Sequence, residues 1–154
     1  HIERATKDGN DREARFNLMS ASMQGAMAFQ KGLGCVHSLS HSLGGVDPRL
    51  HHGTLNAMFL PAVVRFNSSV ESMHKENRLA RMARAMNLAA GSDIADALKE
   101  MNARLQLPTG LAQMGVNSAS FGNIIAGALA DHCHTTNPRR ATSANYTELL
   151  EQSM

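Results

Sequence analysis

The sequence contains 154 residues and has a mass of 16.6 kDa, with 43% hydrophobic and 18% charged residues. This length and composition predict one domain with a hydrophobic core, and they exclude a disordered segment and a coiled-coil rod. The formal net charge of +2 is too small to indicate a nucleic-acid partner or an anionic membrane surface. The longest apolar run, residues 124–130, is far shorter than a membrane span requires.

The two cysteines, Cys35 and Cys133, cannot build a disulfide framework. We therefore expect a reducing compartment and a cytoplasmic location. The first ten residues are polar and charged, which argues against a secretory signal, and the chain does not begin with Met. We expect the sequence to be part of a longer protein.

The composition favours helices over a large sheet. Aromatic residues make up only 4% of the chain, Trp is absent and Met occurs 10 times. Residues that suit a pleated surface are therefore scarce, whereas Ala, Leu and Met enter helices at little cost. The predicted fold class is all-α, a single bundle of several helices without internal repeats.

The first strong helix pattern follows Asp11, a residue that can cap a helix N-terminus. Apolar side chains recur on it at steps of three and four residues: Phe16, Met19, Met23 and Met27. The helix also carries small residues on several of its faces. Because small residues allow neighbours to approach closely, we expect this helix to be central, and we expect it to end at Gly32 and Gly34.

Two further helices are predicted before residue 68. A short one spans about residues 35–43 and should be stopped by the glycine pair 44–45 and by Asp47-Pro48. The next begins near Gly53 and buries Leu55 and Phe59. Pro61 lies inside it and should bend or break it, because the proline ring removes one backbone donor.

The remaining chain supplies four more helix signals. Ser68 and Glu71 have the spacing of a capping box, and Ser92 is placed to cap the following helix. Another helix covers about residues 119–130. The last follows Asn137-Pro138 and should bury Tyr146, Leu149 and Leu150.

Eight histidines is a high number, and four of them lie close together in the sequence. His37 and His41 are four residues apart, so they share one helix face. His51 and His52 stand directly before Gly53, at the start of the next helix. This spacing suits imidazoles that converge on one ion, but ordinary surface histidines would produce the same pattern.

Three other clusters give weaker signals. Residues 131–134 read Asp-His-Cys-His, but consecutive side chains cannot all face one tetrahedral ion. Glu71-x-x-His74 occurs once, whereas a di-iron bundle needs the motif twice. A basic row is typical of a solvated face, with a docking surface as the alternative; it consists of Lys75, Arg78, Arg81 and Arg84.

One segment carries a more specific signal. Positions 32–44 read GLGCVHSLSHSLG, followed by His52-Gly53 and by NAMFLP at positions 56–61. Together with Leu107-Pro108 and Asn137-Pro138-Arg139, these elements closely resemble the iron-containing (group III, iron-type) alcohol dehydrogenases. The resemblance extends over almost the whole chain.

The resemblance implies a two-domain enzyme of which only one domain is present. Residues 1–154 correspond to its C-terminal all-α domain, the dehydroquinate synthase-like α domain, which binds metal and substrate. The N-terminal NAD(P)-binding domain is absent from this sequence. An upstream Asp-x-x-x-His element, which supplies the family's first two metal ligands, is also absent.

The resemblance also assigns roles to individual histidines. His37 resembles the third metal ligand, and His52, before Gly53, resembles the fourth. The interval between them is one residue longer than the family commonly has, and His51 would satisfy the common spacing. His41 resembles the histidine beside the nicotinamide and the substrate, where an imidazole that titrates near neutral pH suits a proton relay.

The implied function is reversible oxidation of a small alcohol to an aldehyde or ketone. A divalent ion, Fe²⁺ or Zn²⁺, would polarise the alcohol oxygen while a hydride passes to NAD(P). The complete enzyme is expected to be a homo-oligomer, with no nucleic-acid or membrane partner. With two ligands and no family carboxylate, this chain alone should bind metal poorly and be inactive.

Two alternatives remain open from the sequence. In the first, the chain is a stand-alone helical module that serves as a binding domain or a scaffold. In the second, it is part of another branch of the superfamily, such as a polyol or sugar-phosphate dehydrogenase. A maleylacetate reductase is disfavoured, because that relative usually has Pro-His-Ala where this chain has His52-Gly53.

Overall fold

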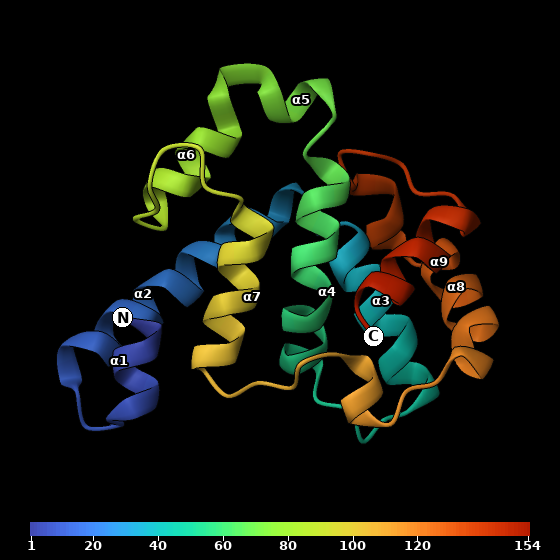
Figure 1. The fold of residues 1–154 in the computed structure, drawn as a ribbon, viewed down its shortest axis with the longest axis horizontal. Coiled ribbons are helices and arrows are strands. Elements are labelled where there is room, and N and C mark those ends of the chain that lie inside the picture. Colours follow the sequence, from blue (N-terminus) through green and yellow to red (C-terminus); the bar gives the residue numbers. More distant parts are fainter.

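The computed structural model describes all residues 1–154 and contains nine α-helices, short 3-10 turns and no strand (Figure 1). The predicted all-α fold class is therefore confirmed. The helices are α1 (Ile2–Lys7), α2 (Arg12–Ala28), α3 (Cys35–Val46), α4 (His52–Asn67), α5 (Glu71–His74), α6 (Arg78–Ala85), α7 (Ile94–Arg104), α8 (Phe121–Ala130) and α9 (Ser143–Gln152).

The helix α4 stands between α7 on one side and α3 on the other, and α8 and α9 lie beyond α3 (Figure 1). The main core fills the space between α3, α4, α8 and α9, and Leu39, Phe59 and Tyr146 are fully buried in it. A smaller core joins α6 to α7. No helix is long and apolar enough to cross a membrane.

The start of α3 is fixed by a side chain from far along the sequence. Gly34 precedes α3 and offers no capping side chain, but the Oδ1 atom of Asn137 accepts a hydrogen bond from the Cys35 N–H at 3.1 Å. The same asparagine donates to Asn67 Oδ1 at 2.7 Å, at the end of α4. Asn137 therefore holds the N-terminus of α3 against the C-terminus of α4.

The other half of α3 is fixed against α8. Ser42 Oγ donates to the Ile124 carbonyl at 2.7 Å, and a Cβ atom at Gly127 would overlap the Ser42 side chain. The backbones of the two helices can approach this closely only because position 127 has no side chain.

Pro61 lies inside α4, but the helix continues unbroken from His52 to Asn67, so the expected break does not occur. Proline removes the N–H that would bond to the carbonyl four residues earlier, which is Ala57. Asn102 on α7 replaces that donor, because its Nδ2 donates to the Ala57 carbonyl at 2.9 Å. A side chain from a neighbouring helix thus compensates for the backbone donor that Pro61 lacks.

We expect Asn102→Ala to lower the free energy of unfolding by about 1–3 kcal/mol, because the Ala57 carbonyl would lose its donor. In a Pro61→Ala background the same change should cost less, since the new N–H at position 61 can bond to Ala57. Urea unfolding of the four variants measures this cycle. An equal cost in both backgrounds would contradict the interpretation.

The helix α2 is not central, and that prediction is wrong. Its apolar stripe faces solvent, with exposed fractions of 71% for Phe16 and Met19, 60% for Met23 and 69% for Met27. The main helix against which α2 packs is the short α1. The sequence pattern correctly indicated an apolar face, but this chain contains no segment that covers it.

Several helix ends also differ from prediction. The helix α3 continues through the glycine pair to Val46 and ends at Asp47-Pro48, the second of its two expected stop signals. Ser68 and Glu71 form no capping box, because Val70 is the N-cap residue of α5. Asp93 caps α7 in place of Ser92. The last helix, by contrast, buries its three expected residues.

We expect the α2 stripe to cause self-association of the 154-residue chain, because four large apolar side chains share one exposed face. Met23→Glu should reduce this association. Leu129→Glu, a similar change at an exposed position of α8, should not. Light scattering at several protein concentrations tests both variants, and a chain that stays monomeric at all concentrations would contradict the prediction.

Candidate metal and substrate site

The helix α3 presents two histidines on one face. His37 and His41 are one turn apart, and their ring centroids lie 5.6 Å from each other. His37 is half-buried and His41 more exposed, with 36% of its side chain open to solvent. The i, i+4 spacing therefore places the rings side by side, as predicted.

The start of α4 distinguishes His51 from His52. His51 is the N-cap residue, and its Nδ1 accepts a hydrogen bond from the Thr54 N–H at 3.3 Å. His52 is the first residue inside the helix. Its ring centroid lies 5.4 Å from that of His37 and 5.3 Å from that of His41. The structure thus brings His37, His41 and His52 together and uses His51 as a helix cap.

Asn56, one turn after His52, lies between two of these imidazoles. Its Nδ2 is 3.0 Å from His52 Nε2 and 3.4 Å from His37 Nε2. An amide group can donate to both rings only when both Nε2 atoms are unprotonated and present lone pairs. Both lone pairs then point to one small region, which is the arrangement that two imidazole ligands need. The Oδ1 atom of Asn56 is buried and has no partner.

The surroundings of His37 favour its neutral form. Burial lowers its pKa most, and the adjoining His52 and His41 lower it further, while Asp131 opposes them. Neutral imidazole is the form that binds a metal ion. The donor set therefore fits a divalent cation, although this chain contributes only part of a coordination shell.

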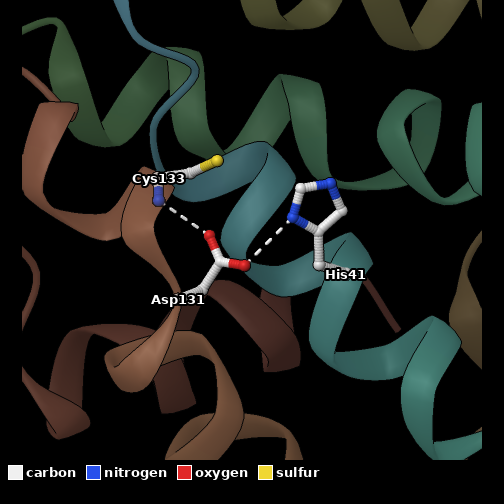
Figure 2. Close-up of side chains that lie close together, drawn as sticks. All are labelled: His41, Asp131 and Cys133. Carbon is white, nitrogen blue, oxygen red and sulfur yellow. Dashed lines mark hydrogen bonds and ion pairs between the residues drawn. The ribbon is translucent and has the colours of Figure 1, made fainter.

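Asp131 enters the site from the end of α8 (Figure 2). Its Oδ2 accepts a hydrogen bond from His41 Nδ1 at 3.0 Å, and its Oδ1 accepts one from the Cys133 N–H at 2.8 Å. Burial would raise the pKa of Asp131, but these hydrogen bonds outweigh it and leave the pKa below its usual value. The carboxylate thus stays charged and fixes both the tautomer and the direction of His41.

Sequence reasoning missed Asp131, because 90 positions separate it from His41. The spacing within residues 131–134 suggested only that four neighbours cannot share one ion. Asn56 was also missed as a site residue. It lies in the quoted motif NAMFLP, four residues after His52, and that helical spacing was the available signal.

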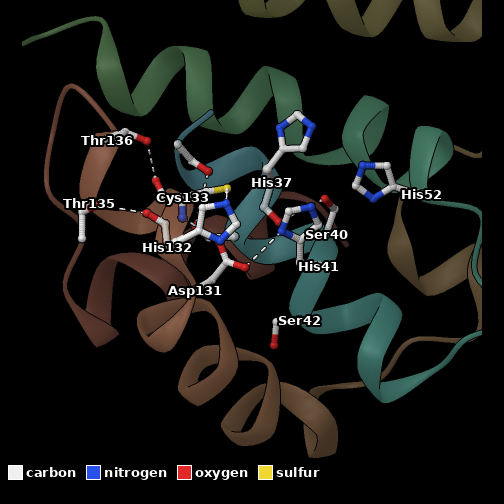
Figure 3. Close-up of polar contacts among 12 residues, drawn as sticks. His37, Ser40, His41, Ser42, His52, Asp131, His132, Cys133, Thr135 and Thr136 are labelled. Atoms are coloured by element: carbon white, nitrogen blue, oxygen red, sulfur yellow. Dashed lines mark hydrogen bonds and ion pairs between the residues drawn. The ribbon is translucent and has the colours of Figure 1, made fainter. Parts of the chain in front are cut away.

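Cys133 and His132 lie next to the aspartate (Figure 3). The Cys133 thiol is 2% exposed, and its Sγ lies 3.4 Å from the Nε2 of His132. Burial, followed by the neighbouring Asp131, raises the pKa of Cys133 to about 11. At neutral pH it is therefore a protonated thiol and an unreactive one.

Other candidates from the sequence lie outside this cluster. His134 is buried, and its Nδ1 is 2.9 Å from the Tyr146 hydroxyl. Cys35 is fully buried in the core, and burial raises the pKa of its thiol. Glu71 and His74 are the first and last residues of the four-residue helix α5, and both are exposed at the surface. The basic row on and before α6 is solvent-exposed.

Residues 1–154 match the family model described as "Fe-containing alcohol dehydrogenase family, C-terminal". The chain belongs to the iron-containing alcohol dehydrogenase family. It is 63% identical to the 4-hydroxybutyrate dehydrogenase of Cupriavidus necator, over 100% of this chain and 41% of that protein. It is 31% identical to the NAD-dependent methanol dehydrogenase of Bacillus methanolicus, over 100% and 42% respectively.

The fold agrees with this assignment. The crystal structure of a 1,3-propanediol oxidoreductase superposes with a TM-score of 0.89 and 28% identity, over 99% of this chain and 41% of that one. The chain therefore spans about two fifths of the length of the iron-containing alcohol dehydrogenases that it matches.

We expect Gly127→Ala to destabilise the fold by about 1–3 kcal/mol, because the added methyl group overlaps Ser42 and forces α3 and α8 apart. The His41–Asp131 hydrogen bond should weaken with it. Gly122→Ala on the same helix meets nothing within 4 Å and should stabilise by up to about 1 kcal/mol.

Urea unfolding measures the two stabilities, and the NMR signal of the His41 Nδ1–H reports the hydrogen bond. If Gly127→Ala and Gly122→Ala had the same stability and the same His41 signal, the close approach of α3 and α8 would not control the position of Asp131.

Proposed function

We propose that residues 1–154 form the helical metal- and substrate-binding domain of an NAD(P)-dependent alcohol dehydrogenase. The complete enzyme would interconvert a small alcohol and its aldehyde or ketone by hydride transfer. The observation that carries this proposal is that His37 Nε2 and His52 Nε2 both face the Nδ2 atom of Asn56, in a chain of this family.

His37 and His52 are the residues of this chain that would hold the metal ion, iron or zinc. When bound, the ion supplies Lewis-acid polarisation of the substrate oxygen. His51 is the weaker candidate, because its Nδ1 already caps α4. The remaining ligands would come from residues that precede this chain, together with the NAD(P)-binding domain.

His41 is the proposed proton relay. Its Nδ1–H is donated to Asp131, so its Nε2 is the atom left to accept a proton and pass it on. The ring is close to both proposed metal ligands and is partly exposed, so it can exchange a proton with solvent. Asp131 would hold the ring in this direction and stabilise the charge that forms on it.

The exposed stripe of α2 supports the two-domain organisation. Four large apolar side chains on one helix face need a cover, and the chain is two fifths as long as its relatives. We propose that the preceding part of the polypeptide covers this face. The relative with 63% identity makes 4-hydroxybutyrate the first substrate to test.

The test uses the complete polypeptide that carries this chain, with NAD or NADP and 4-hydroxybutyrate. Metal analysis should find one divalent ion per chain in the parent, and at least about ten-fold weaker retention in His37→Ala and His52→Ala. His51→Ala is the matched control; it should keep the metal and lose about 1 kcal/mol of stability through the lost cap.

Unchanged metal content in both His37→Ala and His52→Ala would remove the site assignment. If the complete polypeptide oxidised no alcohol with either cofactor, the proposed activity would be wrong, and a binding module would be the better interpretation.

A further inference from the structure

A second group of metal-binding atoms lies beside the histidine cluster. One ring nitrogen of His41, a carboxylate oxygen of Asp131 and the Sγ of Cys133 all lie within 4.8 Å of one another (Figure 2). They come from two segments, α3 and the turn after α8, that the contact between Ser42 and Gly127 holds together. Neither His37 nor His52 belongs to this group.

We propose that His41, Asp131 and Cys133 form a second, inhibitory site for Zn²⁺ or another thiophilic divalent ion. The binding itself rests on the positions of these three side chains. Its inhibitory effect rests on the proposed function, because it engages His41.

The composition of the group favours zinc over calcium or magnesium. A nitrogen, an oxygen and a sulfur donor suit Zn²⁺, whereas the hard ions prefer oxygen alone. Zinc bonds to such atoms are about 2.0–2.3 Å long, so tetrahedral donors lie about 3.4–3.8 Å apart. The three side chains, now within 4.8 Å of one another, need to close by no more than about 1 Å around an ion. The backbone hydrogen bond from Cys133 to Asp131 keeps the turn in a single conformation, which limits the entropy lost on binding.

A fourth donor is available at the surface. The Nε2 of His132 lies 3.4 Å from Cys133 Sγ, its ring centroid is 6.3 Å from that of His41, and its side chain is 84% exposed (Figure 3). The run 131–134 therefore need not aim four consecutive side chains at one ion. Asp131 and Cys133 face inward together, and α3 contributes the nitrogen.

Binding has a defined proton balance. The protonated thiol of Cys133 and a divalent ion give a sulfur–metal bond and one released proton. Asp131 loses its hydrogen bond from His41 and gains a bond to the ion in exchange, while the His41 proton moves from Nδ1 to Nε2 so that Nδ1 presents a lone pair to the ion. The imidazole of His41 is then a metal ligand and is no longer oriented for proton transfer.

Cobalt(II) is the probe, because a thiolate–cobalt bond gives a near-ultraviolet charge-transfer band that nitrogen and oxygen ligands do not. Titration of the complete polypeptide with CoCl₂ should produce this band and saturate at one thiolate-bound ion per chain. Cys133→Ala should abolish it. Cys35→Ala removes the other buried thiol, which has no such neighbours, and should leave the band intact.

Two further variants guard against a folding defect in Cys133→Ala. His41→Ala and Asp131→Ala keep the thiol but should weaken cobalt binding at least ten-fold, with circular dichroism confirming helical folds. No band in the parent, or a band that persists in Cys133→Ala, would overturn the site.

The site formed by His41, Asp131 and Cys133 can be tested separately from the metal site proposed at His37 and His52. The band should survive in a His37→Ala, His52→Ala double variant, whose loss of metal reports on the other site. In the active enzyme, the zinc concentration that halves turnover should be at least ten-fold higher for Cys133→Ala than for the parent. The control variant Cys35→Ala should keep the zinc sensitivity of the parent. An unchanged zinc sensitivity would refute the inhibitory role.

Discussion

The close approach of α3 and α8 at Ser42 and Gly127 is the constraint on which the site depends. Asp131 lies one turn after Gly127, so the distance between the helix backbones sets the distance from its carboxylate to His41. A methyl group at position 127 would separate the helices and remove the carboxylate from reach. A core contact and the His41–Asp131 hydrogen bond are thus fixed by the same missing side chain.

The opposite end of α3 is held by an equally specific interaction. Asn137 accepts from the first N–H of α3 and pairs with Asn67 at the end of α4, so the relative position of these helices is fixed at two points. His37 lies two residues after Cys35, the residue that Asn137 anchors. Its imidazole faces His52 because α3 can neither slide nor rotate against α4. The geometry of this histidine pair comes from polar contacts at helix ends, while the apolar core between α3, α4, α8 and α9 supplies the stability.

Local spacing could be predicted from the sequence, whereas contacts between distant segments could not. The shared face of His37 and His41 and the buried residues of α9 follow from helical periodicity alone. The pairing of Asp131 with His41 depends on tertiary packing across 90 positions, which no local pattern encodes. The error over α2 has a related cause: periodicity identifies an apolar face but does not say whether this chain contains the segment that covers it. Pro61 shows the reverse case, in which a tertiary donor, Asn102, overrides a local helix-breaking signal.

The extra residue between His37 and His52 illustrates why helix phase matters more than distance along the chain. His51 caps α4 through its own ring and so fixes where that helix starts. The first helical position then falls to His52, and Asn56 lies on the same face one turn later. His51 could take the place of His52 in this cluster only with a different cap, and its ring would be rotated by roughly 100° about the helix axis.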